Sequence, residues 1–156
     1  MDTINYFEAT LSDIQTLVML RVEFMTELWG SQSENITKEL EKNLSAYFTK
    51  AIQNSSCIFH FAKCNDEIVG VGGLIIREQP GNFRNPSGKV GFLINMYTRT
   101  SHRRKGICSR LLNDLIDAAK ERGIHAFELT ATKEGEMVYV QNGFEMRPDP
   151  TYWKFI

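Results

Sequence analysis

The residues with the clearest chemical potential form a short basic segment, Arg103-Arg104-Lys105-Gly106-Ile107-Cys108. It follows a β-rich run at 89–97 and opens an amphipathic helix expected at 107–122. The first amides of a helix have no partners within the helix and carry partial positive charge, so they attract anions. Gly106 lets the backbone approach a ligand closely or adopt unusual dihedral angles. The segment therefore predicts a pyrophosphate site, and coenzyme A is the carrier that we expect.

The elements that must position this segment are a mixture of strands and helices without strict alternation. Hydrophobic periodicity and turn signals predict strands at 3–8, 57–64, 67–77, 89–97 and 125–131. The same signals predict helices from the Thr10 region to Trp29, at 35–53, at 107–122 and at 134–141. Residues 143–146 and 152–156 are expected to form a closing hairpin or a paired edge. This order favours a central mixed sheet covered by helices.

Length and composition indicate one domain, residues 1–156, with a real hydrophobic core. The chain has 156 residues, of which 42% are hydrophobic and 24% are charged. Its formal net charge of −1 provides no global field for nucleic acid or an anionic membrane. The basic cluster is also too short for a nucleic-acid surface, so we expect neither nucleic acid nor a membrane as a partner.

Cysteine and histidine usage argues against a disulfide framework and against a metal site. The three cysteines lack ligand spacing and fit a reducing compartment, and no secretory signal or membrane-spanning run is visible, which predicts a cytoplasmic protein. The three histidines are far apart in the sequence, so no metal is expected. Cys108 lies in the first turn of a helix beside basic residues, where its thiol pKa could be lowered. Packing of a small side chain is the favoured interpretation of this cysteine.

The order of these motifs resembles the GNAT superfamily of N-acetyltransferases over essentially the whole chain. The acetyl-CoA signature of that family, Gln/Arg-x-x-Gly-x-Gly/Ala, is matched at Arg103 and Gly106. A late signature, a tyrosine shortly before Gly-Phe, is matched by Tyr139 and Gly143-Phe144. Two positions depart from the pattern: Cys108 stands where the family has Gly or Ala, and Thr132 stands where many members have asparagine.

The resemblance implies an α+β fold in α/β/α layers and acetyl-CoA as co-substrate, with no metal. The implied sheet is mixed, mostly antiparallel and splayed at the strand 89–98, with six to seven strands and about four helices. Backbone groups near Met96, Tyr97 and Thr98 would bind the pantetheine arm and the thioester. The loop and helix start would bind the pyrophosphate, which makes the remaining cofactor residues Arg103, Arg104, Lys105, Gly106, Ile107, Cys108 and Ser109.

The implied activity is transfer of the acetyl group to a primary amine of a small molecule or a protein, by direct attack in a ternary complex. Tyr139 is the candidate general acid, because a phenol with a pKa of about 10 is protonated at neutral pH and can donate to a thiolate. The alternative for this residue is a half-buried tyrosine that packs the short helix. The alternative for the whole chain is a non-catalytic acyl-CoA-binding or regulatory module.

The acceptor side is less defined by the sequence. Glu128 is a candidate base or substrate contact, and a water relay to a distant carboxylate is equally compatible. Arg21 interrupts the apolar stripe of the first helix and Glu27 lies six residues on, so either could face an acceptor cleft or form a rim ion pair. The apolar C-terminal segment allows a homodimer through paired last strands, or an internal edge strand.

Overall fold

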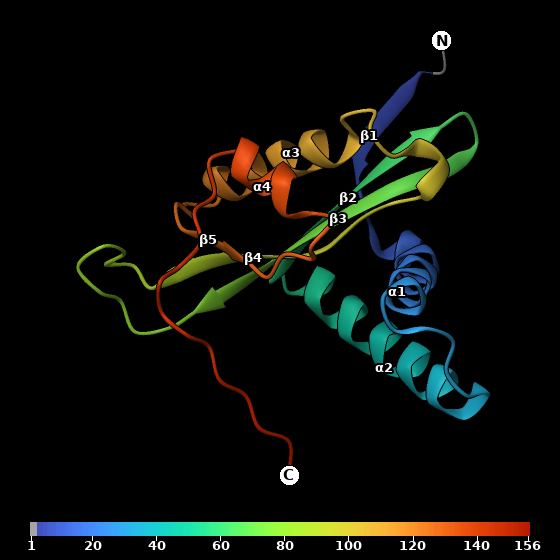
Figure 1. The fold of residues 1–156 in the computed structure, drawn as a ribbon, viewed down its shortest axis with the longest axis horizontal. Helices are drawn as coiled ribbons and strands as arrows, with labels where there is room; N and C mark the ends of the chain where they lie inside the picture. Colours follow the sequence, from blue (N-terminus) through green and yellow to red (C-terminus); the bar gives the residue numbers. More distant parts are fainter. Residues whose placement is uncertain (1–2) are drawn as a thin grey trace.

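The structure, a computed structural model, describes residues 3–156 and arranges them as one five-stranded sheet between two layers of helices (Figure 1). The strand order is β1-β2-β3-β4-β5, and all pairings are antiparallel except the parallel pair β4–β5. The strands are β1 (Ile4–Glu8), β2 (Cys57–Cys64), β3 (Glu67–Glu78), β4 (Lys89–Thr98) and β5 (Phe127–Leu129). This confirms the mixed, mostly antiparallel sheet expected from the sequence.

Helices α1 (Ile14–Trp29) and α2 (Glu34–Gln53) lie on one side of the sheet and helices α3 (Ile107–Glu121) and α4 (Glu136–Gln141) on the other, which confirms the layered arrangement (Figure 1). On the face that α1 and α2 cover, the core is formed by Leu17, Leu20, Phe48, Phe59 and Phe61. A 3₁₀ turn, η1 (Leu11–Asp13), precedes α1. A second 3₁₀ turn, η2 (Thr100–His102), follows β4.

Helix α3 forms where the sequence predicts it because its apolar residues recur at helical spacing and its end carries a glycine. Ile107, Leu111, Leu112, Leu115 and Ala119 are all at most 2% exposed and face the sheet. The helix stops before Gly123, which has a left-handed φ of 76°. Burial of this stripe therefore fixes the position of the Gly106 end of α3 against the sheet.

Strand β4 contains a bulge, and beyond it the end of the strand pairs with β3 but not with β5. The pairing with β3 runs from Gly73↔Ile94 to Val71↔Tyr97, so Asn95 and Met96 together face Gly72. Asn95 adopts a left-handed φ of 55°, a conformation that asparagine tolerates better than most residues. Strand β5 pairs with β4 only from Gly91 to Leu93. Beyond Leu93, the edge of β4 has no strand partner among residues 3–156, which matches the predicted splay.

The closing hairpin expected at 143–146 and 152–156 is wrong, and the sheet has five strands rather than six to seven. No residue of 143–156 is in a strand, and the C-terminal segment leaves the body of the molecule (Figure 1). Pro148 and Pro150 flank Asp149 and supply no N–H donors, so this stretch cannot continue a ladder. Strand β5 is also shorter than the expected 125–131. Within residues 3–156, no helix combines the length and the apolar character needed to cross a membrane.

Candidate active site

The loop between β4 and α3 places a left-handed glycine directly before the first turn of the helix. Gly106 is the N-cap of α3 with a φ of 76°, and Arg104 also has a left-handed φ of 62°. No side chain of residues 3–156 caps the helix, and the N–H of Arg110 is the first to donate back, to the Gly106 carbonyl at 3.0 Å. The amides of Ile107, Cys108 and Ser109 are therefore available to a ligand. A Cβ on Gly106 would meet no atom of residues 3–156 within 4 Å, so the space beside this glycine is open.

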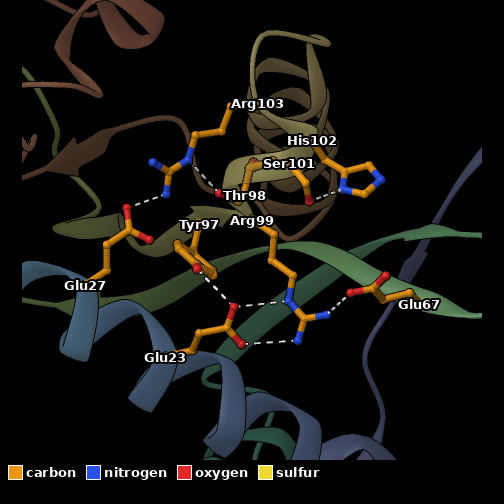
Figure 2. Close-up of polar contacts among 9 residues, drawn as sticks. All are labelled: Glu23, Glu27, Glu67, Tyr97, Thr98, Arg99, Ser101, His102 and Arg103. Atoms are coloured by element: carbon orange, nitrogen blue, oxygen red, sulfur yellow. Dashed lines mark hydrogen bonds and ion pairs between the residues drawn. The ribbon is translucent and has the colours of Figure 1, made fainter. Parts of the chain in front are cut away.

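Arg103 points away from this helix start and toward α1. Its Nε donates to the Thr98 carbonyl at 2.8 Å, and its Nη2 forms an ion pair with Glu27 (Figure 2). The sequence assigned Arg103 to the phosphates and Glu27 to the acceptor, and the structure instead brings the two together. Arg104 and Lys105 remain exposed beside Gly106, where their charges can act on a phosphate.

A second ion pair lies one helical turn earlier on α1. Arg99 donates from Nε and Nη2 to the two carboxylate oxygens of Glu23, each at 3.1 Å, and also pairs with Glu67 through Nη1 (Figure 2). The Tyr97 hydroxyl donates to Glu23 Oε1 at 3.0 Å. Burial, followed by this hydrogen bond, raises the pKa of Tyr97. The hydrogen bond to Glu23 likewise raises the pKa of Arg99.

Sequence reasoning missed this network, although a signal for it exists. Glu23 and Glu27 are four residues apart on α1, and Arg99 and Arg103 are four residues apart after β4. On helix α1, residues four apart lie on the same face, and Arg99 and Arg103 flank the short turn η2. Two carboxylates and two guanidiniums with matching spacing can therefore join two elements, provided that the fold sets these elements side by side.

At the end of β4, backbone groups rather than side chains are available to a ligand. Tyr97 and Thr98 are buried, at 5% and 9% exposure, and Met96 packs with the α3 side of the core. The polar side-chain atoms of Asn95 and Thr98 are buried without a hydrogen-bond partner among residues 3–156. The chemical groups available at this edge are therefore the amides and carbonyls that β5 leaves unpaired.

Tyr139, on α4, is buried to 9% exposure and packs edge-on against Phe144, with ring centroids 6.1 Å apart. Burial, with a smaller effect from the nearby Cys108, raises the pKa of the phenol. No residue of 3–156 forms a hydrogen bond with its hydroxyl, and the side chain lines a cavity of about 840 Å³. The phenol is thus a protonated donor beside an open space.

Cys108 is a neutral thiol in this environment. Burial raises its pKa to about 11, which is opposite to the lowered pKa considered from its place in the first helical turn. The side chain is only partly exposed, and it lies near enough to Tyr139 to raise the pKa of that phenol. The packing interpretation of Cys108 therefore fits the structure better than a nucleophilic role.

The remaining predicted residues lie in different environments. Glu128 lines the same cavity as Tyr139, and its Oε1 accepts from Arg147 Nη1 at 3.1 Å. Arg21 is half-buried on α1, and no ion pair or hydrogen bond to it is formed within residues 3–156.

Thr132 accepts the Gly135 N–H at 3.2 Å and so stabilises the turn before α4. Ser109 accepts from Asn142 at 3.3 Å, which links α3 to α4.

Comparison with known proteins gives a consistent result. The model of the acetyltransferase (GNAT) family matches residues 21–144. A predicted acetyltransferase from Clostridium acetobutylicum, solved with acetyl-CoA, is 29% identical over 97% of this chain and 96% of its own, with a TM-score of 0.89. A GCN5-related N-acetyltransferase from Ralstonia eutropha is 20% identical over 97% and 99%, with a TM-score of 0.85. Glucosamine-6-phosphate N-acetyltransferase from Arabidopsis thaliana is 15% identical over 99% and 100%, with a TM-score of 0.74.

The last two similarities, at 20% and 15% identity, show the fold alone. No curated protein sequence matches the chain significantly. Among the residues that the structure describes, no group of three or more His, Cys, Asp or Glu side chains is arranged to hold a metal ion.

Proposed function

Because the chain belongs to the acetyltransferase (GNAT) family, we propose that it moves the acetyl group of acetyl-CoA to a primary amine of a small molecule or a protein. The observation that carries this proposal is the pairing of two features at one end of β4. The uncapped start of α3 behind Gly106 can hold a pyrophosphate, and the unpaired edge of β4 beyond Leu93 can hold an amide-containing arm.

The cofactor is placed by matching its chemistry to these two features. Its pyrophosphate lies on the amides from Arg104 to Ser109, with the charges of Arg104 and Lys105 beside it. Its pantetheine arm runs along the backbone of Met96, Tyr97 and Thr98, on the edge that faces away from β3 and that β5 does not pair. Arg103 contributes by its main chain, because its guanidinium is held by Thr98 and Glu27.

The transfer itself is a direct attack in a ternary complex. The amine nitrogen forms the bond to the thioester carbon, the carbon–sulfur bond breaks, and the departing thiolate takes a proton from Tyr139. The amine loses one proton, which restores the phenol by way of solvent. Glu128 is engaged by Arg147, so we assign the removal of the amine proton to water rather than to this carboxylate.

The test is acetyl-CoA consumption with a panel of amines, alongside a calorimetric Kd for CoA. We expect CoA binding together with turnover of at least one class of amine. CoA binding with no turnover of any amine would favour the alternative, a non-catalytic acyl-CoA-binding module. Loss of both in a folded protein would contradict the placement of the cofactor.

We also propose that two copies of the chain associate through the C-terminal segment. Tyr152, Trp153, Phe155 and Ile156 are each more than 80% exposed, and β5 is an edge strand of three residues beside the cavity of about 840 Å³. Burial of these side chains against the β5 edge of a second copy would remove apolar surface from water. Sedimentation of the full chain and of a chain ending at Thr151 tests this, since only the full chain should form dimers.

A further inference from the structure

The charged side chains of α1 differ in whether they have a partner near the candidate site. The helix carries three charged side chains, Arg21, Glu23 and Glu27. Both carboxylates are engaged, because Glu23 is held by Arg99 and Tyr97 and Glu27 is held by Arg103 (Figure 2). Neither carboxylate is free to attract the ammonium group of a substrate, which was the role that the sequence suggested for Glu27.

Arg21 is the remaining charge, and it lies on the inner face of the helix. At 3.6 residues per turn, it projects between Phe24, about 60° to one side, and Met25, about 40° to the other. The ring of Phe24 stacks on Tyr97 of β4, with centroids 5.3 Å apart. The two glutamates lie about 120° to 160° away around the helix, which explains why they do not pair with Arg21.

The guanidinium of Arg21 is partly removed from water, and no anionic side chain of residues 3–156 pairs with it. Burial is the one cause that shifts its pKa, which is lowered, and no carboxylate of residues 3–156 lies within ion-pair distance of the guanidinium. A half-buried, uncompensated charge costs free energy that a bound anion would recover. A guanidinium suits a carboxylate or a phosphate because its parallel N–H donors match their paired oxygens.

We propose that Arg21 binds an anionic group of the acceptor, so that the substrate is a small amine that also carries a carboxylate or a phosphate. This inference rests on the proposed acetyltransferase function and narrows its substrate class. The anion would lie against α1 near Phe24 and Tyr97, and the amine would point along β4 toward the thioester. Polycationic amines are the class that this wall disfavours, because it has no free carboxylate to receive them.

The experiment compares pairs of acceptors that differ only in the anion. Lysine is compared with cadaverine, and glucosamine 6-phosphate with glucosamine, so that one arm tests a carboxylate and the other a phosphate. Acetyl transfer is measured for the wild type, Arg21→Gln, Arg21→Lys and the control Lys42→Gln, which removes an exposed cation from α2. Binding of the same four compounds to the CoA-loaded protein is measured by calorimetry.

We expect one anionic acceptor to have a KM at least about tenfold below that of its partner, with Arg21→Gln abolishing this difference. Arg21→Lys should restore part of it, while Lys42→Gln and the Kd for CoA should be unchanged. Preference for the partner without the anion, or an equal loss for both partners in Arg21→Gln, would overturn the inference. Anion-dependent binding without turnover would support the inference and contradict the proposed catalysis.

Discussion

The guanidinium of Arg103 forms an ion pair with Glu27 and so joins the cofactor loop to helix α1 (Figure 2). Both side chains are 40% exposed, so solvent screens the pair and its direct contribution to stability is small, about 1 kcal/mol or less. Its value to the protein is therefore geometric. The contact fixes how the loop that follows β4 is oriented relative to the helix beside it.

This relationship predicts that Arg103 positions the loop and does not bind phosphate through its side chain. Arg103→Gln and Glu27→Gln should each weaken CoA by a few-fold, and the double variant should be no weaker than either single one. The Kd for CoA is measured by calorimetry in a double-mutant cycle. Additive losses, with a smaller salt dependence of the Kd in Arg103→Gln alone, would instead identify Arg103 as a phosphate ligand.

Gly106 should be required for cofactor binding far more than for folding. Gly106→Ala places a Cβ at a left-handed residue directly before α3, which costs roughly 1–2 kcal/mol of stability and adds a methyl group to the open space beside the loop. We expect the Kd for CoA to rise by at least tenfold. Gly123→Ala is a matched control, because Gly123 has the same φ of 76° and equally open surroundings at the other end of α3.

The two glycine variants should therefore lose similar thermal stability and differ in the Kd for CoA. Equal Kd values in both would show that the pyrophosphate lies elsewhere.

Tyr139→Phe should slow turnover and leave the Kd for CoA nearly unchanged. Loss of a general acid lowers kcat by about 10²- to 10⁴-fold. The phenol is buried and its pKa is raised above the usual value of about 10, so it stays protonated throughout the neutral and mildly alkaline range. The kcat of the wild type should consequently show no fall from loss of this proton up to about pH 10. A decline in kcat centred near pH 8 would assign the proton to another group.

His60 should make the fold less stable in mild acid. Burial lowers its pKa, and its Nε2 has no hydrogen-bond partner among residues 3–156. Above the unfolded-state pKa of about 6.5 the ring is neutral in both states, so it has no pH-dependent effect. As the pH falls below that value, the unfolded chain binds the proton more readily and stability decreases toward the lower, folded-state pKa. His60→Gln should flatten the dependence of the melting temperature on pH between 6.5 and 5.

The sequence was sufficient to predict the parts of the fold that depend on local pattern. Helix α3 is fixed by its apolar periodicity and its flanking glycines, and the strands predicted at 57–64 and 67–77 by their alternation and the turn signals that bound them. The left-handed Gly106 likewise follows from a local requirement. These features need little knowledge of distant residues.

The features that were missed depend on tertiary partners. Glu27 and Arg103 are 76 positions apart, and no local sequence pattern indicates that their side chains form an ion pair. The C-terminal residues 152–156 are mostly apolar, but they pair with no strand within residues 3–156, and two prolines precede them. The pKa of Cys108 is raised rather than lowered, because burial disfavours the charged thiolate.

The two ends of the chain differ in how far the sheet depends on them. Each residue of β1 is in register with β2, from Ile4↔Cys64 to Glu8↔His60, so deleting this strand would leave a sheet edge bare. Residues 152–156 contribute no ladder and lie outside the core. Truncation at the N-terminus that removes β1 should therefore unfold the protein, whereas removal of the last five residues should leave each protomer folded.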